Sequence, residues 1–327
     1  MCYESAGDAC GAGCCGAAGA LGGCALRMAE AAVHFVESMD VTIADCEFRQ
    51  TGAWGLGLTR GTSYTTVSQN RFFDTSGGGV YLGNVNETRS NSSAPRPTEL
   101  SVTDNTIINT GVEYQGSSGI HLFSAVDTTI AHNRLIHIPY TAITFVWPVP
   151  QGDSFNRNLS LVGNDVSDPS YWGEDGGAVH TLALCLDCVI ERNYFHNQSH
   201  GSKCTYIDNG SSGYNISDHV VDHANKSLWL YYQQSCNPRC PYLGPSKYAQ
   251  PYVGCNATAH DKCCCNAGDN NHAARCYVRA SLDDPFPIQN ITSLTRVADD
   301  APFPPAAQKI IAAAGPRPVA GGGCGVF

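Results

Sequence analysis

The hexapeptide Val102-Thr103-Asp104-Asn105-Thr106-Ile107 carries a pattern that recurs along the chain: an apolar residue, two variable residues, an Asn-like residue, one variable residue and a second apolar residue. Six further segments follow it, four clearly and the last two more weakly: Val67–Phe72, Ile130–Leu135, Leu161–Val166, Ile190–Phe195, Ile43–Phe48 and Ile216–Val221. The Asn-like positions of all seven lie 24, 35, 28, 31, 29 and 26 residues apart. A repeat of this period predicts a solenoid of stacked units.

Most of these units carry a second short stretch in which apolar residues alternate with others, as a strand with one buried face requires. The six stretches are Gly79–Leu82, Gly119–Leu122, Ala142–Phe145, Ala178–Thr181, Thr205–Asp208 and Leu228–Tyr231. Gly and polar residues mark the joins, and no long helical pattern separates the strands. The sequence therefore predicts an all-β parallel β-helix rather than βαβ units.

The recurring Asn has a structural explanation. Coils of a β-helix stack at roughly 4.8 Å, so an Asn at one turn position of every coil can bond the amides of its neighbours. Asn also tolerates the left-handed backbone of a tight turn. We expect Asn70, Asn105, Asn133, Asn164 and Asn193 to form one internal column that has no catalytic role.

Differences in residue composition along the chain divide it into four parts. Residues 1–32 are rich in Gly, Ala and Cys, and we expect them to be an incomplete cap, since the repeats begin almost at once. Residues 33–235 hold the coils, and residues 236–280 form a Cys-rich loop insert. Residues 281–327 form a tail, with a short helix predicted over residues 304–314.

Composition narrows the classes of partner. The chain has 327 residues, a net charge of −10 and only 15% charged residues. Nucleic acid and anionic membranes need basic patches, so neither is an expected partner, and a strongly anionic polysaccharide is a less suitable substrate. No apolar stretch approaches the ~20 residues of a membrane span. We expect a monomer that needs no metal and no cofactor.

Cysteines and glycosylation signals point to the secretory pathway. The chain has 17 cysteines and nine Asn-x-Ser/Thr sequons, at Asn86, Asn91, Asn158, Asn197, Asn209, Asn215, Asn225, Asn256 and Asn290. We therefore expect a secreted or cell-surface glycoprotein. Sequons also arise by chance in chains rich in Asn, Ser and Thr, and Asn209 and Asn215 have the alternative role of turn residues.

Each of the two cysteine clusters has two possible interpretations. A zinc site with His260 or His272 is possible in the Cys-rich segment, but a loop stapled by disulfides is the interpretation we favour. Cys185-Leu-Asp-Cys188 resembles a redox motif, yet it lies between short strands and lacks the βα context of such sites. We interpret it as a disulfide or a pair of buried thiols.

Candidate functional residues lie on the outward positions of the second strand. Tyr81, His121, Thr144, His180 and Tyr206 should stack in one column on the exterior, with Tyr114, Tyr140, Trp147 and Trp172 on the adjoining turns. Aromatic and His side chains along an outer groove suit sugar rings, which present CH faces and hydroxyls. Each residue alone is compatible with ordinary surface.

Acidic residues flank this column. Glu174-Asp175-Gly-Gly177 precedes the strand of His180, and Asp208-Asn209-Gly-Ser-Ser-Gly213 ends the next. Two carboxylates beside an aromatic groove are what a glycosidase needs, one as acid and the other as nucleophile or base. Both segments are also ordinary turn formers. On straight strands the two carboxylates would lie roughly 23 Å apart, so they meet only if Glu174–Gly177 folds back.

Four segments and the tail carry a family resemblance: Val112–Ile120, Pro139–Trp147, Asp175–Thr181, Tyr206–Gly213 and Ala306–Gly315. They resemble right-handed parallel β-helix carbohydrate-active proteins, above all glycoside hydrolase family 141, known for fucosidase and xylanase activities. The resemblance covers about residues 30–235 and 290–318. It implies that Asp175 and Asp208 are the catalytic pair. Asn209 stands where the family motif has Glu, and His180 replaces a usual Tyr.

The sequence therefore predicts a glycoside hydrolase that uses two carboxylates on a plant- or algal-type polysaccharide or oligosaccharide. The expected substrate-binding residues are His180, Tyr206, Trp147, His121, Tyr114 and Glu174. A polysaccharide lyase or epimerase on the same fold ranks second, with His180 as base, because no Lys or Arg is expected in the groove to neutralise a uronate. A non-catalytic carbohydrate-binding solenoid is the third reading, favoured if Asn209 marks a lost site.

Overall fold

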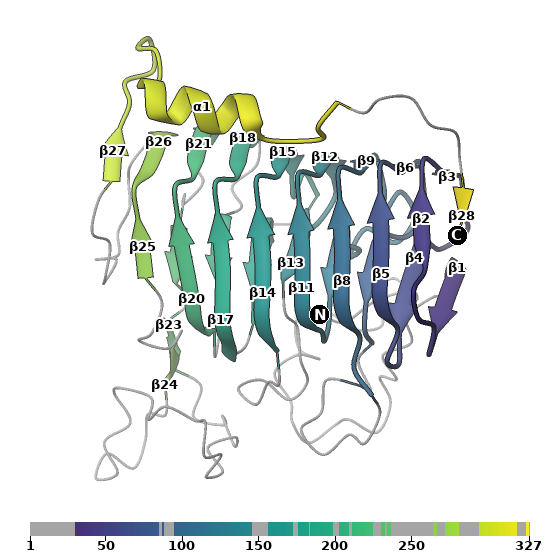
Figure 1. The fold of residues 1–327 in the computed structure, drawn as a ribbon. Helices are drawn as coiled ribbons and strands as arrows, with labels where there is room; N and C mark the ends of the chain where they lie inside the picture. Colours follow the sequence, from purple (N-terminus) through teal and green to yellow (C-terminus); the bar gives the residue numbers. More distant parts are fainter. Residues whose placement is uncertain are drawn as a thin grey trace, which may run out of the picture.

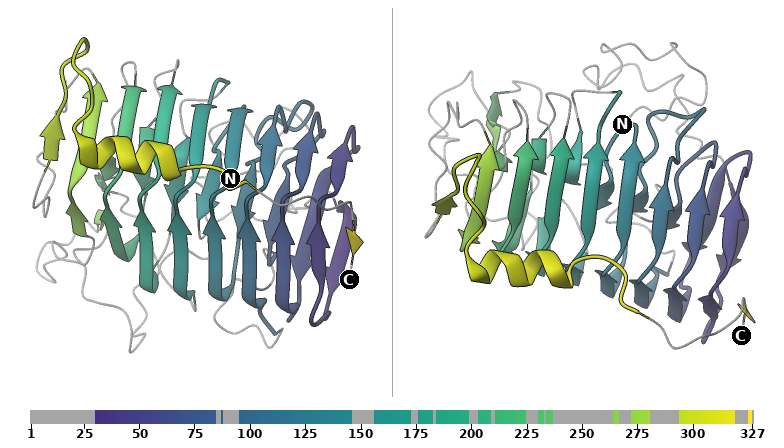
Figure 2. Two further views of the ribbon diagram at one scale, coloured as in Figure 1. Left: turned by 45° about the horizontal axis from the view of Figure 1, so that its top comes forward. Right: turned by 90° about the horizontal axis from the view of Figure 1, so that it is seen from above.

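The computed structural model is a right-handed parallel β-helix whose chain winds through three long sheets (Figure 1). The structure describes residues 30–84, 87, 95–145, 156–172, 176–182, 184–198, 203–208, 211–224, 230–232, 234–236, 264–266, 272–280, 294–318 and 325–326. The predicted fold class is thereby confirmed. Two further views show the strands of successive coils stacked side by side, with one helix along a corner (Figure 2).

Each sheet takes one strand from every coil. Sheet A contains β1 (Ala31–Val36), β4 (Trp54–Thr59), β7 (Val80–Leu82), β10 (Ile120–Leu122), β13 (Ile143–Phe145), β16 (Gly177–Thr181), β19 (Lys203–Ile207) and β22 (Leu230–Tyr232). Sheet B contains β2 (Thr42–Ala44), β5 (Ser63–Ser68), β8 (Thr98–Thr103), β11 (Val126–Ala131), β14 (Arg157–Val162), β17 (Leu184–Glu191), β20 (Ser212–Ser217), β25 (His272–Ala274) and β28 (Gly325–Val326). Sheet C contains β3 (Glu47–Arg49), β6 (Arg71–Phe73), β9 (Thr106–Ile108), β12 (Arg134–Ile138), β15 (Asp165–Pro169), β18 (Tyr194–Gln198), β21 (Val220–Ala224), β26 (Cys276–Ala280) and β27 (Leu294–Arg296).

A coil therefore has three strands where the sequence indicated two. The hexapeptide 102–107 is not one strand, because β8 ends at Thr103 and β9 begins at Thr106. Its two apolar residues, Val102 and Ile107, are fully buried on either side of the turn between sheets B and C. The repeat pattern thus marks the turn itself, and sheet A supplies the third strand.

The interior is apolar and continuous. In sheet A, Leu56, Val80, Ile120, Ile143 and Val179 are aligned on successive strands, and all are fully buried. Burying one such side chain stabilises the fold by about 1.5–3 kcal/mol. Because every coil buries residues against both neighbours, the stack depends on many coils together.

The Asn column exists as predicted. The backbone N–H and Nδ2 of Asn105 both donate to Oδ1 of Asn133, at 3.0 and 2.9 Å, and Nδ2 also donates to the carbonyl of Val67 at 2.9 Å. The same hydrogen bonds join Asn70 to Asn105, Asn133 to Asn164 and Asn164 to Asn193. The column is buried and its side chains bond protein groups, as a structural role requires.

One reason for the Asn was wrong. The left-handed backbone belongs to the residue before each Asn, with φ of 61° at Gln69, 58° at Asp104 and 54° at His132. The Asn residues are required for their side-chain amides, which face inward and form hydrogen bonds with the next coil. The preceding position is free to vary, so it left no pattern in the sequence.

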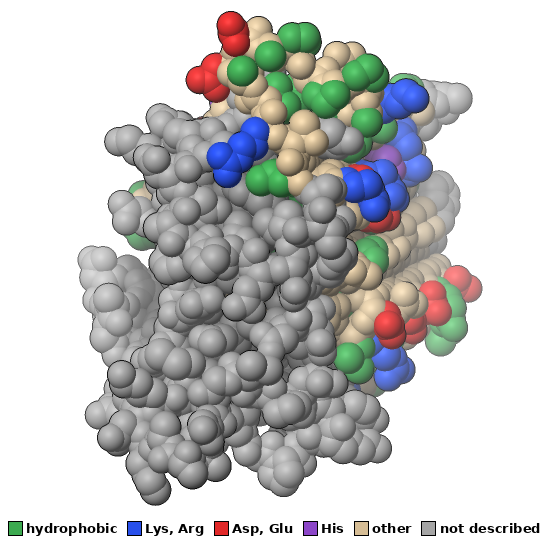
Figure 3. All heavy atoms as spheres, turned by 90° about the vertical axis from the view of Figure 1, so that its left-hand side faces the viewer, with side chains coloured by type: hydrophobic (Ala, Val, Ile, Leu, Met, Phe, Trp, Pro, Cys, Tyr) green, Lys and Arg blue, Asp and Glu red, His purple; other side chains and the backbone are tan. Residues whose placement is uncertain are grey.

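Helix α1 (Pro305–Ala313) covers one corner of the solenoid. Phe303 and Ala307 bury against Val220 of β21, and Ile310 and Ile311 pack beside them. Seen from the end nearest β27, hydrophobic side chains gather at the top of the molecule, where α1 lies (Figure 3). No helix in the part of the chain that the structure describes is long and apolar enough to cross a membrane.

A disulfide joins Cys185 and Cys188 within β17, which agrees with one of the two readings of that motif. A small antiparallel pair, β23 (Gln234–Cys236) with β24 (Cys264–Asn266), borders the Cys-rich segment. Cys240, Cys255 and Cys263 of that segment, and the N-terminal residues 1–29, lie outside the described residues, and the disulfides expected in the segment stay a prediction.

Candidate active site

The structure aligns the predicted column on sheet A. Tyr81 pairs in register with His121, His121 with Thr144, Thr144 with His180, and His180 with Tyr206. Their neighbours along each strand, such as Val80 and Ile120, belong to the central core. Because side chains alternate across a strand, the column faces the other side of the sheet.

The column is buried, which corrects its predicted exposure. His121, Thr144 and His180 are 0% exposed, and Tyr81 and Tyr206 are 3% exposed. Tyr81 forms a separate apolar cluster with Trp54 and Phe123, outside the central core. Alternation along a strand shows which face a residue takes, but it does not show what covers that face.

His180 and Asp208 form the polar centre of the column. Nε2 of His180 lies 3.1 Å from Oδ2 of Asp208, within hydrogen-bonding distance. The His180 ring stacks on Tyr206, with centroids 4.2 Å apart and planes 9° from parallel. His180 therefore contacts Asp208 and Tyr206, and its full burial argues against the predicted direct contact with a sugar.

The backbone around Asp208 is fixed from two sides. Its N–H donates to the carbonyl of Thr181 at 3.0 Å, and its carbonyl accepts from the N–H of Ser211 at 3.0 Å. The hydroxyls of Thr181 and Ser211 lie 2.9 Å apart. Asp208 follows β19 directly and its side chain is 11% exposed, so the carboxylate lies against His180 with a small part open to solvent.

Lys203 also belongs to this group, although no Lys or Arg was expected there. Its Nζ lies 4.4 Å from the centre of the Tyr206 ring, a cation–π distance. Lys203 begins β19, and its long aliphatic stem lets the charge reach a ring three residues ahead. The sequence held no signal for this contact, because residues three apart on a regular strand face opposite sides of the sheet.

His121 lies two strands from His180 and packs among aromatic rings. Its ring stacks on Phe123 at 3.7 Å and meets Trp54 edge-on at 6.3 Å. Burial holds the pKa of His121 well below its ordinary value, so the ring is neutral at neutral pH. Beside it, the hydroxyls of Thr144 and Ser118 lie 2.6 Å apart. These contacts are those of a packed, uncharged residue.

The aromatic residues of the turns differ in exposure and in whether they contact the column. Tyr140 reaches the column, with its ring 6.4 Å from that of His180. Trp172 is 62% exposed and its N–H donates to the carbonyl of Pro139 at 3.0 Å. Tyr114 is half-buried in the turn before β10, where its N–H donates to Ser76. Of these three residues, Tyr140 contacts the column.

Several predicted site residues lie outside the described residues: Asp175, Glu174, Trp147 and Asn209. The separation of the two predicted catalytic carboxylates therefore stays a prediction. Among the residues described, no group of three or more His, Cys, Asp or Glu side chains could hold a metal ion.

Comparisons with known proteins agree with the fold. The family described as right handed beta helix region matches residues 16–148. No curated protein matches the chain. A solved structure named "Glycoside hydrolase" matches with a TM-score of 0.52 and 20% sequence identity, over 61% of this chain and 37% of that one. The chain spans little more than a third of that neighbour, and the likeness shows a shared right-handed β-helix fold.

Proposed function

We propose that this protein is a glycoside hydrolase acting on a plant- or algal-type polysaccharide or oligosaccharide. The observation that carries the proposal is the contact between His180 and Asp208, which positions a carboxylate at the end of β19. The structural neighbour, itself named a glycoside hydrolase, supports the same class of reaction.

The described residues suit distinct roles. Asp208, as a carboxylate, is the nucleophile or general base, and His180 positions it through the Nε2 hydrogen bond. Tyr206 holds the His180 ring by stacking, and Lys203 places a positive charge over Tyr206. Tyr140 and Trp172 offer aromatic faces for sugar rings. The resemblance to family 141 supplies the second carboxylate, Asp175.

A rate assay on glycosides tests the proposal. Purified protein should release reducing ends from at least one member of a panel of aryl glycosides and plant or algal polysaccharides. Asp208→Asn should lower kcat about a thousandfold or more, because an amide is neither nucleophile nor base. Asp187→Asn is the matched control, since Asp187 is an exposed carboxylate on sheet B. Equal rates for wild type and Asp208→Asn would exclude Asp208 from catalysis.

Variants of His180 separate positioning from packing. His180→Phe keeps a ring against Tyr206 but removes the hydrogen bond, so kcat should fall about a hundredfold while KM changes little. His180→Gln can still donate to Asp208 and should recover part of the loss. Equal losses in both variants, with lowered thermal stability, would indicate that His180 only fills space.

A polysaccharide lyase ranks second, and Lys203 is the observation that favours it. The ammonium group of Lys203 supplies the positive charge that a uronate requires and that the sequence did not lead us to expect beside Tyr206. In that reaction a base removes the proton beside the carboxylate, the bond to the leaving sugar breaks, and a double bond forms. The unsaturated product absorbs ultraviolet light, whereas hydrolysis leaves only a new reducing end. Binding of glycans without cleavage would favour the third reading, a carbohydrate-binding solenoid.

A further inference from the structure

The C-terminal segment contacts coils that lie far apart in the solenoid. It starts where Phe303 and Ala307 pack on Val220, in the coil of β21. It ends with β28, which pairs with β2 in the first described coil. The order of sheet B places six coil steps between these two contacts, or about 29 Å. Helix α1 and β28 therefore contact coils that lie six steps apart in the stack (Figure 1).

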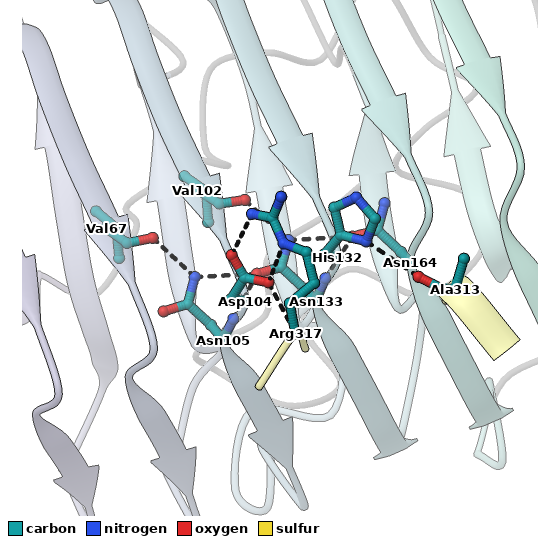
Figure 4. Close-up of polar contacts among 9 residues, drawn as sticks. All are labelled: Val67, Val102, Asp104, Asn105, His132, Asn133, Asn164, Ala313 and Arg317. Atoms are coloured by element: carbon teal, nitrogen blue, oxygen red, sulfur yellow. Dashed lines mark hydrogen bonds and ion pairs between the residues drawn. The ribbon is translucent and has the colours of Figure 1, made fainter. Parts of the chain in front are cut away.

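Two contacts tie the middle of this segment to one corner. The N–H of Gly315 donates to the carbonyl of Gly163 at 2.9 Å, and Nδ1 of His132 lies 3.2 Å from the carbonyl of Ala313. Gly163 and His132 occupy the same position in successive coils, directly before the ladder residues Asn164 and Asn133. Figure 4 shows His132 between the ladder and Ala313. The segment thus lies against the turn between sheets B and C.

Arg317 makes a third contact, the strongest of the three. Its backbone N–H and Nε each lie 2.9 Å from Oδ1 of Asp104, and Nη2 lies 2.5 Å from Oδ2 (Figure 4). The Asp104 side chain is 7% exposed. Burial alone would raise the pKa of Asp104, but the hydrogen bonds from Arg317 outweigh it and hold the pKa below its usual value. A paired, largely buried carboxylate makes Asp104 a fixed anchor point.

The last contact closes a sheet edge. Ile43 pairs with Val326 and Ala44 with Gly325, and this pairing is antiparallel, unlike every other described pairing in sheet B. An open edge strand presents unpaired N–H and C=O groups to which another chain can add. In the part of sheet B that the structure describes, β28 occupies that position beside β2.

We propose that residues 303–318, anchored on Asp104, and β28 together form a clasp, whose strand protects the β2 edge of sheet B from strand addition by a second copy of this chain. The occupant of the edge is β28 itself, and a second copy takes its place when the clasp is released. The antiparallel pairing carries the proposal, because β28 belongs to no coil and adds no repeat to the stack.

Two full-length variants test the clasp. Gly325→Pro combined with Val326→Pro removes both N–H donors of β28 and leaves β2 unchanged. Arg317→Ala removes the two side-chain bonds to Asp104 and keeps the backbone one. Lys309→Ala is its matched control, since Lys309 is an exposed cation of α1. Hydrogen exchange followed by mass spectrometry reports on residues 42–44, and light scattering over a concentration series reports the oligomeric mass.

The proline variant should exchange the β2 amides at least tenfold faster than wild type, and its mass should rise with concentration. Arg317→Ala should show both effects more weakly, whereas Lys309→Ala should match wild type. Unchanged exchange at β2 would overturn the proposal. Faster exchange with the mass of wild type at every concentration would also overturn it, because the released edge would then recruit no second copy.

Discussion

Nδ1 of His219 accepts a 3.2 Å hydrogen bond from the backbone N–H of Asn193, so a histidine continues the amide column. An Nδ1 that accepts cannot carry a proton, and burial lowers the pKa of His219 to about 4. The neutral ring is therefore part of the folded structure. The unfolded chain has the ordinary His pKa of about 6.5.

This difference predicts a loss of stability in acid. The contribution of His219 is complete above about pH 6.5 and is lost as the pH falls to about 4, where the loss amounts to about 3 kcal/mol. His219→Asn should be stable at neutral pH and should lack this loss. Urea unfolding of both proteins between pH 7 and pH 4 measures this loss. Burial raises the pKa of Glu87 to about 7, so Glu87 makes the folded state more stable as the pH falls. Both proteins contain Glu87, so its contribution cancels when the free energy of unfolding of one is subtracted from that of the other. Parallel pH curves for the two proteins would contradict the prediction.

Asn133→Ala should be strongly destabilising. It removes the Oδ1 that accepts from Asn105 and the Nδ2 that donates to Val102 and Asn164. A buried N–H of Asn105 is left without its acceptor, so the free energy of unfolding should fall by about 3 kcal/mol or more. Asn215→Ala, at an exposed position of β20, should change it by less than about 0.5 kcal/mol. Comparable losses in denaturant unfolding would show that the column contributes little.

Gly57→Ala tests the packing of the buried column. A Cβ at Gly57 would lie 2.3 Å from Cζ of Tyr81, whose ring packs against Trp54. The ring must move, so the substitution should cost about 1–3 kcal/mol. Gly52→Ala is the control, because a Cβ there meets nothing within 4 Å. Thermal unfolding should separate the two variants, and equal melting temperatures would show that the column is loosely packed.

Glycosylation is the test of the proposed secretion. Within the described residues, the sequon residues Asn158, Asn197 and Asn215 are all exposed. Protein secreted from eukaryotic cells should carry glycans there, and treatment with an N-glycosidase should increase its mobility. Asn215→Gln should remove the mass of one glycan. An unshifted band from secreted protein would argue against all three sites.

The amide column was predictable because its requirement is local and repeated. Each coil needs one inward amide at a fixed turn position, so Asn70, Asn105 and Asn133 leave a visible period in the sequence. The third strand of each coil was missed because the pattern marks a turn and not a strand. The two apolar residues of the repeat pattern belong to strands of different sheets, and periodicity along the chain does not show this.

The candidate site was only partly predictable. Alternation placed His180 and Tyr206 on one face, since side-chain direction follows from strand geometry. Their burial depends on groups distant in sequence, and the contact of Lys203 with Tyr206 depends on a flexible side chain. A short motif predicts neither which residues pack over the outer face of a sheet nor which rotamer a lysine adopts.

The amide column also has a direction. In each step, Asn70 to Asn105 and onward to Asn193, the donor comes from the earlier coil and the acceptor from the later one. Every coil thus presents the same acceptor to its predecessor and the same donor to its successor. A gene duplication that inserts one whole coil would meet both neighbours correctly, and a deletion of one would rejoin them. The length of such a protein can therefore change by whole coils while the amide hydrogen bonds between successive coils stay the same.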